Sequence, residues 1–315
     1  DSPLVAGLSD GAQYVGSDIP ALIRHTRTVE LLDEREVAVL TRSGVRVYDH
    51  FGNERALKPI HVDWDVEAAE KGGYAHFMLK EIHEEPAALK KTFSAHVDAE
   101  KMAIRPGAFP ISAEEANSLR TLTIVACGTA YHAGVVGKYV IEKLARLPVV
   151  VDVASEFRYR NPILGAGDCF LAISQSGETA DTLAALQEAK RRGAKTLAVV
   201  NAEHSTLAKN ADAFLPVKAG TEIAVASTKA YSCQAAALYA LAEFLRAAAL
   251  PLQKRCAPDF SALNALCAGL SYGDGNEEKE IARLFCGGKK LFFIGRGDDY
   301  RTALEASLKI KETSY

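Results

Sequence analysis

The chain has 315 residues, 48% of them hydrophobic and 24% charged, and a formal net charge of −3 at pH 7. This composition is typical of a soluble globular protein with two or three domains, and the nearly balanced charge disfavours nucleic acid or a membrane surface as partner. Six cysteines without a CxxC pair disfavour a zinc site, and with no apolar run of transmembrane length we expect a cytoplasmic protein without bound metal.

The first 65 residues are β-rich. Two short apolar runs, 37–40 and 45–48, flank an Arg42-Ser43-Gly44 turn, which is typical of a β-hairpin. A helical pattern then runs through Phe93, and residues 99–120 contain the chain breakers that characterise a linker. We therefore expect a β-rich region, a connecting segment over 66–120, and a new domain from residue 121.

From residue 121 apolar strand patterns alternate with helical patterns. Strands are predicted at 121–126, 148–153, 170–173, 195–200 and 214–217, and helices at 131–144, 183–192 and 227–248. This alternation favours an α/β fold with a doubly wound parallel sheet.

The last part of the chain repeats the start of that domain. Helices are predicted at 258–271 and 276–285, followed by a strand at 290–294, a Gly295-Arg296-Gly297 turn and a helix from Thr302. The strand, small-residue turn and helix resemble residues 124–144, so we interpret them as the beginning of a second copy. The predicted parts are thus 1–65, 66–120, 121–275 and 276–315.

Three polar turns stand where strands lead into helices. Ser174-Gln175-Ser176-Gly177-Glu178-Thr179 follows one strand, Cys127-Gly128-Thr129-Ala130 follows the first, and residues 220–229 precede the long helix. In a doubly wound sheet, ligands bind beyond the carboxyl ends of the strands, and helix N-termini favour anions. We interpret the turns as a cradle for a sugar phosphate.

The alternative interpretation is that each serine or threonine is simply a helix N-cap. One cap needs only one hydroxyl, whereas residues 174–179 offer three, so this alternative is weaker for the set than for any single turn. No turn matches a GxGxxG or Walker sequence, which disfavours a nucleotide.

The last predicted helix carries Glu305, Lys309 and Glu312. Their spacing of four and three residues places all three on one helical face. A carboxylate beside an amine, near a sugar-phosphate cleft, can move a proton between adjacent carbons of a carbonyl sugar. From spacing alone, a solvated salt-bridge stripe is the favoured alternative.

Motifs in a fixed order resemble the glucosamine-6-phosphate synthase family, the isomerising glutamine–fructose-6-phosphate aminotransferases. They are CGTAYHAG, ASEFRYRNP, SQSGETADTL, AGTEIAVASTKA, GRGDDY and LEASLKIKETSY, preceded by the linker-like YAHFMLKEIHEEPAALKKT. Residues 1–65 are similar to the end of that family's glutaminase domain, which has the N-terminal-nucleophile fold. The resemblance implies an interdomain linker over 66–120, a first sugar isomerase domain over 121–275 and the start of a second over 276–315.

The resemblance also implies an activity, the amination and isomerisation of fructose 6-phosphate to glucosamine 6-phosphate with ammonia from glutamine, the first committed step of hexosamine synthesis. It implies that Glu312 is the base, that Lys309 is the amine beside it, and that Glu305 occupies a matching polar position. No cofactor is needed, because the imine itself makes the neighbouring C–H acidic. The implied sugar-phosphate contacts are Cys127, Gly128, Thr129, Ser174, Gln175, Ser176, Thr179 and the backbone of Val225.

The sequence departs from the family pattern at both ends. The family's glutaminase nucleophile is a cysteine at the mature N-terminus, whereas the first residue here is Asp1 and the glutaminase core that would precede it is absent. The later segment with a ring-opening histidine and a lysine is absent as well. We therefore expect this chain to retain phosphate contacts but not to complete turnover alone. Competing interpretations are a non-catalytic sugar-phosphate-binding regulator and a sugar-phosphate isomerase or deglycase of the same fold. A homodimer is expected, because symmetric homo-oligomers are the common case.

Overall fold

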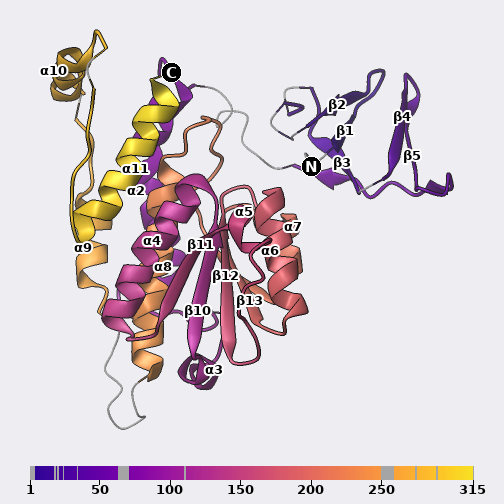
Figure 1. The fold of residues 1–315 in the computed structure, drawn as a ribbon. Coiled ribbons are helices and arrows are strands. Elements are labelled where there is room, and N and C mark those ends of the chain that lie inside the picture. The colour runs from indigo at the N-terminus through magenta and orange to yellow at the C-terminus, as the bar shows by residue number, and fades with distance from the viewer. Residues whose placement is uncertain are drawn as a thin grey trace. The chain divides into compact units, whose positions relative to one another are not determined.

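A computed structural model (Figure 1) describes residues 4–314 except 18, 20, 24, 34, 63–70, 110, 250–258, 274 and 289. The chain divides into two compact units, Asp1–Phe77 and Met78–Tyr315. The predicted boundary at residue 65 and the start of the helix predicted at 258 lie outside the described residues. Within the described part of the chain, no helix combines the length and apolar character that crossing a bilayer demands.

The first unit is built from antiparallel strands. One sheet has the order β2-β1-β3-β7 and a second the order β4-β5-β6. The hairpin predicted around Arg42-Ser43-Gly44 is confirmed, because β4 and β5 pair antiparallel on either side of it. The strands are β1 Leu4–Leu8, β2 Tyr14–Gly16, β3 Thr28–Leu32, β4 Val37–Thr41, β5 Gly44–Tyr48, β6 Glu54–Arg55 and β7 Ile60–His61.

The second unit contains the predicted parallel sheet, with the strand order β11-β10-β12-β13-β14. Its strands are β10 Thr121–Ala126, β11 Val149–Val153, β12 Asp168–Ser174, β13 Lys195–Val200 and β14 Ala213–Pro216. The chain leaves β10 toward β11 and then crosses back to β12 on the other side. The switch point of the sheet therefore lies between β10 and β12, where this type of fold binds its ligands.

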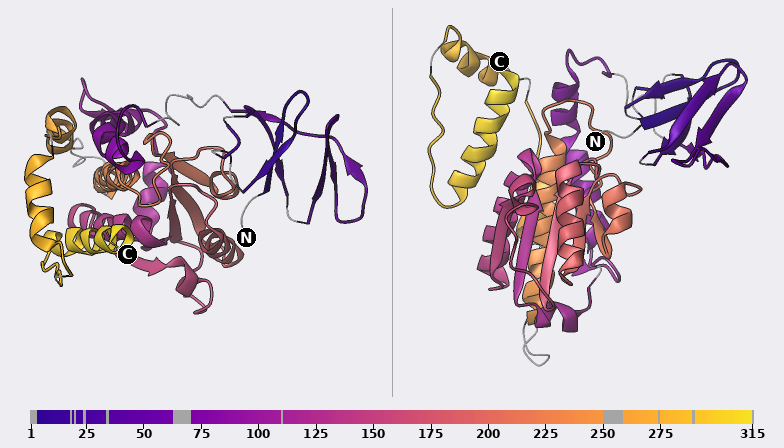
Figure 2. Two further views of the ribbon diagram at one scale, coloured as in Figure 1. Left: turned by 90° about the horizontal axis from the view of Figure 1, so that it is seen from above. Right: turned by 45° about the vertical axis from the view of Figure 1, so that its right-hand side comes forward.

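Helices cover both faces of this sheet (Figures 1 and 2). One core holds Leu171 and Ile173 with residues of α2, α4 and α8, whereas Phe170 and Ala172 belong to a second core with residues of α5, α6 and α7. Successive side chains of a strand point to opposite faces, so one apolar strand serves both cores. The helices are α2 Phe77–His96, α4 Gly128–Leu144, α8 Lys229–Ala249, α5 Ala154–Phe157, α6 Ala180–Arg191 and α7 Thr206–Asn210.

The segment predicted as a linker is partly structured. β8 Val97–Asp98 pairs with β9 Ala103–Ile104, and α3 Ala113–Ser118 begins with a capping box between Ser112 and Glu115. Phe109, Ile111 and Ala116 lie in the core. The Pro and Gly residues there break the chain into short elements, but the apolar residues between them still pack.

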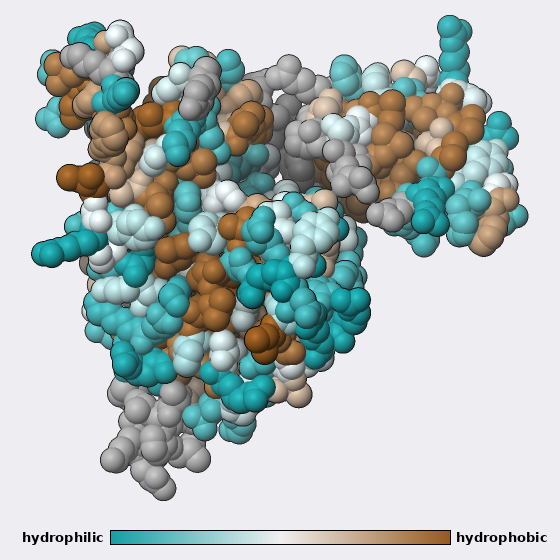
Figure 3. Space-filling model, in the orientation of Figure 1, coloured by the Kyte–Doolittle hydropathy of each residue, from teal (hydrophilic) through white to brown (hydrophobic). Residues whose placement is uncertain are grey.

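The C-terminal part holds α9 Ser261–Gly269, α10 Asn276–Phe285 and α11 Asp298–Thr313, and α11 packs along α4. The strand predicted at 290–294 is wrong: these residues form no strand, because no described strand lies beside them to complete a ladder of hydrogen bonds. Several apolar side chains are exposed here, and Figure 3 shows brown hydrophobic atoms among teal hydrophilic ones at α10.

Candidate functional site

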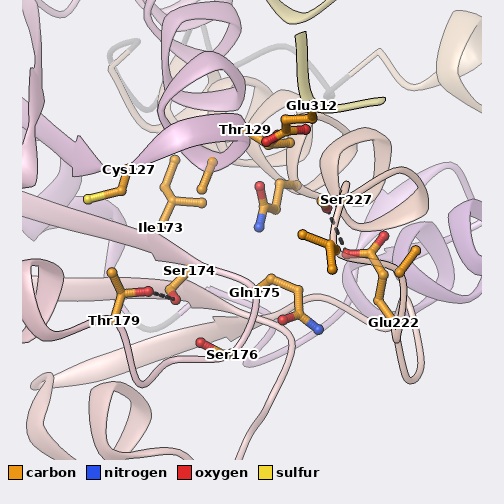
Figure 4. Close-up of a pocket in the computed structure, with 14 residues that line it drawn as sticks. Cys127, Thr129, Ile173, Ser174, Gln175, Ser176, Thr179, Glu222, Ser227 and Glu312 are labelled. Atoms are coloured by element: carbon orange, nitrogen blue, oxygen red, sulfur yellow. Dashed lines mark hydrogen bonds between the residues drawn. The ribbon is translucent and has the colours of Figure 1, made fainter. Parts of the chain in front are cut away.

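A cavity of about 270 Å³ opens at the carboxyl ends of β10 and β12 (Figure 4). Of the site residues predicted from sequence, all except Gly128, Lys309 and Glu305 line it. The lining consists of Cys127, Thr129, Ala130, Ile173, Ser174, Gln175, Ser176, Thr179, Glu222, Ala224, Val225, Ser227, Gln234 and Glu312. The fold thus brings polar turns from three parts of the chain to one hollow at the switch point.

The turn after β12 is fixed from within. The buried Ser174 hydroxyl accepts a hydrogen bond from the N–H of Gly177 at 2.9 Å and lies 3.4 Å from the hydroxyl of Thr179. Gly177 has a φ of +68°, and a Cβ there would lie 2.0 Å from Oγ of Ser205, so only glycine fits. The Ser176 hydroxyl accepts from the N–H of Glu178 at 3.2 Å and is exposed beside the cavity.

Two helices begin at residues that line the cavity. Thr179 is the N-cap residue of α6 and Cys127 that of α4, yet neither side chain makes a capping hydrogen bond. The first N–H groups of an α-helix have no partner within the helix, and the helix dipole favours negative charge there. Simple N-capping therefore does not account for Thr179, and both helix ends remain available to an anion.

The third turn differs from the prediction that all three act alike. One oxygen of Glu222 accepts from the N–H groups of Thr228 at 2.8 Å and Ala230 at 3.2 Å, and the other accepts from the hydroxyl of Ser227 at 2.7 Å. A carboxylate of the chain itself therefore occupies the N-terminus of α8. Its charge would repel a phosphate, so this side of the cavity suits neutral hydroxyl groups.

On α11, Glu305 lies behind the cavity and is tied to α4. Its Oε1 accepts from the hydroxyl of Thr129 at 3.0 Å, and its Oε2 lies 2.7 Å from Nδ1 of His132. Nζ of Lys309 is 3.4 Å from Oε1 of Glu305 and 2.5 Å from Oε2 of Glu312. Glu305 is only 7% exposed, Lys309 is half-buried and Glu312 is exposed, so a solvated stripe does not describe Glu305. Lys309 instead links a buried carboxylate to one that lines the cavity.

This environment keeps Glu305 ionised. Burial by itself raises the pKa of its carboxyl, but the hydrogen bond with His132, the charge of Lys309 and the hydroxyl of Thr129 outweigh burial and lower the pKa below its usual value. Burial and the negative charge of Glu305 raise the pKa of the neighbouring Tyr231 to about 12. Glu305 is therefore suited to holding Lys309, and Glu312 is the α11 carboxylate that reaches the cavity.

Sequence reasoning did not single out Gln234 or His132, and it named Glu222 and Ser227 only as part of the turn at 220–229. Gln234 of α8 lines the cavity, is 1% exposed, and its Oε1 accepts no hydrogen bond from the described residues. A buried amide oxygen without a donor is suited to accept from a ligand hydroxyl. His132 follows Thr129 by three residues on α4, and this spacing could have indicated a shared face. Nothing in the local sequence marks Gln234.

Comparisons with known proteins place these features in context. Residues 117–244 match the model of the SIS domain. Curated relatives include the glutamine–fructose-6-phosphate aminotransferases [isomerizing] of Clostridium tetani and Caldanaerobacter subterraneus, each 47% identical to this chain over its whole length. The match covers 52% of each relative, so the chain spans about half the length of these proteins.

Solved structures agree with the fold. The C-terminal domain of glucosamine-fructose-6-phosphate aminotransferase from Francisella tularensis superposes with a TM-score of 0.70 and 36% identity, covering 78% of this chain and 69% of that one. A glucosamine-6-phosphate deaminase from Thermotoga maritima has a TM-score of 0.54 and 22% identity over 75% of this chain and 67% of its own, which is a likeness of fold alone.

Proposed function

Because this chain belongs to the glutamine–fructose-6-phosphate aminotransferase family, we propose that it carries the sugar-phosphate site of an enzyme that makes glucosamine 6-phosphate from fructose 6-phosphate and glutamine. The observation that carries this proposal is the shared cavity: the turn at 174–179, the start of α4 and Glu312 of α11 all line it. Donors for a phosphate and a carboxylate for proton transfer thus lie around one hollow.

The phosphate would lie between the turn after β12 and the N-terminus of α4. Ser176, Thr179 and Gln175 offer hydroxyl and amide donors there, and the uncapped ends of α4 and α6 add N–H groups. Glu222 opposes an anion at the α8 side. The charges therefore favour one orientation of the ligand, with its phosphate near β12 and its sugar hydroxyls toward the loop that carries Val225.

The chemistry proposed for the other end of the sugar is a proton transfer. Ammonia would condense with the C2 carbonyl to give an imine and water, and the imine would make the C1 proton acidic. Glu312 would take that proton and return it at C2, so no external cofactor is required. Lys309, 2.5 Å from Glu312, would hold that carboxylate in place while Glu305 holds Lys309 from behind.

Further features of the whole protein are proposed from family membership. We propose glutamine as the nitrogen donor, a homodimer as the assembly and the cytoplasm as the location. The division into a glutaminase part over 1–65, a linker over 66–120, a first sugar isomerase domain over 121–275 and the start of a second over 276–315 stays a prediction. The parallel sheet with the strand order of the second unit supports the third of these parts.

Isothermal titration calorimetry of the chain with fructose 6-phosphate and glucosamine 6-phosphate tests the proposal. We expect both to bind, and Ser176→Ala to weaken binding about tenfold because it removes a hydroxyl donor to a charged group. Ser118→Ala, at the end of α3 and outside the cavity, should bind like the unmodified chain. Absence of binding of either sugar phosphate, or phosphate density away from Ser176 and Thr179 in a soaked crystal, would refute the site.

A further inference from the structure

A glutamate of α2 reaches the loop between β14 and α8 that forms one wall of the cavity. Oε1 of Glu81 accepts hydrogen bonds from the N–H of Ile223 at 2.6 Å and the N–H of Ala224 at 3.0 Å. Glu81 is 2% exposed, and its Oε2 has no hydrogen-bond partner among the described residues. Burying a carboxylate costs free energy because the group loses its contact with water. The two hydrogen bonds from backbone N–H groups to Oε1 are the main interactions that offset this cost.

A second contact from α2 holds the end of the same loop. Nζ of Lys229, the first residue of α8, lies 2.6 Å from Oε2 of Glu84, and Lys229 is 3% exposed. A Cβ built on Gly220, near the start of the loop, would lie 3.9 Å from that Nζ. The helix therefore contacts both the middle and the end of the segment 220–229.

The tip of the loop reaches the surface at Val225. Val225 is fully exposed, yet it and Ala224 line the cavity. Glu222 closes the loop onto the start of α8, but it does not touch the N–H groups of Ile223 and Ala224. In the described residues these two N–H groups are held by Glu81, so Glu81 fixes the backbone that leads directly into Val225.

We propose that Glu81 is a positioning residue of the sugar-phosphate site: through the N–H groups of Ile223 and Ala224 it sets the backbone of the Val225 loop before the ligand binds. This inference rests on the proposed function for the identity of the ligand. A loop that is already ordered loses less conformational entropy on binding, so its anchor raises affinity without touching the ligand.

Three variants of the whole chain test this role. Glu81→Leu removes the acceptor, Glu81→Gln keeps an acceptor oxygen on a side chain of the same length, and Glu81→Asp keeps the charge but falls short of the loop. Glu85→Leu is the matched control, because Glu85 lies one turn further along α2 and bonds Tyr272 instead of the loop. Hydrogen-exchange mass spectrometry of residues 219–228 reports loop order without ligand, and calorimetry with fructose 6-phosphate reports affinity.

We expect Glu81→Leu to speed exchange at 219–228 and to weaken fructose 6-phosphate binding about tenfold, since two hydrogen bonds to a charged acceptor are lost. Glu81→Gln should restore both readouts to within about threefold of the unmodified chain, and Glu85→Leu should change neither. If Glu81→Leu does not fold, as judged by circular dichroism, Glu81→Asp takes its place and should give the same changes as expected for leucine.

The outcomes separate this inference from the proposed function. If the unmodified chain binds no sugar phosphate, the proposed function fails while the exchange data still test the anchoring of the loop. If it binds and the Glu81 variants bind equally well, Glu81 does not position the site, even where exchange is faster. Unchanged exchange in Glu81→Leu overturns the anchoring itself.

Discussion

Two hydroxyl residues that precede helices do different work in this chain. The Ser112 hydroxyl accepts from the N–H of Glu115 at 3.1 Å, and the N–H of Ser112 donates to Oε2 of Glu115 at 2.7 Å, so Ser112 caps α3. Thr179 holds the same position before α6 without capping it, and it lines the cavity, where its hydroxyl lies 3.4 Å from that of Ser174. The same residue type in the same local position can therefore be structural in one place and available to a ligand in another.

This contrast gives a matched pair of substitutions. Thr179→Val keeps the shape and removes the hydroxyl, so we expect fructose 6-phosphate binding to weaken about tenfold while stability changes little. Ser112→Ala should leave binding unchanged and lower the free energy of unfolding by about 1 kcal/mol, because a cap is lost. Calorimetry and urea unfolding measure the two effects, and the reverse pattern would make Thr179 the structural residue.

The lowered pKa of Glu305 predicts a dependence of stability on pH. A carboxyl that binds its proton more weakly in the folded chain stabilises the fold above its unfolded pKa of 4.5, and that stabilisation is lost as the pH falls toward the lower folded value. Glu305→Gln has no proton to bind, so its stability should fall less on acidification. Urea unfolding midpoints between about pH 5.5 and pH 3.5 measure the difference, and parallel curves would contradict the assignment.

At the scale of elements, the turn between β12 and α6 depends on one glycine. Gly177 and Gly193 both have positive φ, at +68° and +80°, so alanine is strained at either position. Only at Gly177 does a Cβ meet another side chain, Oγ of Ser205 at 2.0 Å, since nothing lies within 4 Å of the corresponding position at Gly193.

We therefore expect Gly193→Ala to lower the free energy of unfolding by about 1–2 kcal/mol through backbone strain alone. Gly177→Ala should cost about 1–3 kcal/mol more because of the added clash, and it should also abolish sugar-phosphate binding by moving Ser176 and Thr179. Urea unfolding and calorimetry of the two variants check this. Equal costs at both glycines would show that Ser205 simply moves aside.

At the scale of the molecule, the cavity draws its walls from distant parts of the sequence. The start of α4, the turn after β12, the loop before α8 and the end of α11 all line it. The strand order of the sheet brings the first two together, because it puts β10 beside β12. A ligand in this cavity must touch several of these segments at once. Ligand binding should therefore slow hydrogen exchange in several separate segments at once, which binding to a single motif would not do.

Saturating fructose 6-phosphate should slow hydrogen exchange in four separate segments, 127–132, 174–180, 222–228 and 305–312. The hairpin at 37–48, in the first unit, should exchange at the same rate with and without ligand, and inorganic phosphate should protect mainly 127–132 and 174–180. Hydrogen-exchange mass spectrometry resolves these peptides. If fructose 6-phosphate protected only the turn after β12, the cavity would bind the phosphate alone, and the predicted contacts with the sugar would be wrong.

Much of this architecture follows from the sequence because the signals are local. Apolar runs of strand length alternate with amphipathic helices, and this alternation predicted the strands β10–β14 and the helices α4, α6 and α8 to within a few residues, whereas the short helices α5 and α7 were not predicted. The strand predicted at 290–294 failed because a strand also needs a neighbour, which a local pattern cannot reveal. The polar turns after β10 and β12 were likewise visible as residues between two predicted elements.

What the sequence by itself determined is therefore the fold class, the strand-to-helix turns and the candidate residues on one face of α11. Only the tertiary structure decided which of them act together. Glu305 meets Thr129 and His132, Glu81 meets the Val225 loop, and Glu222 occupies the helix end that the sequence had offered to a phosphate. The physical reason is that local periodicity determines whether a segment forms a helix or a strand. Pairing between charged groups far apart in the chain depends on which segments the tertiary fold brings side by side.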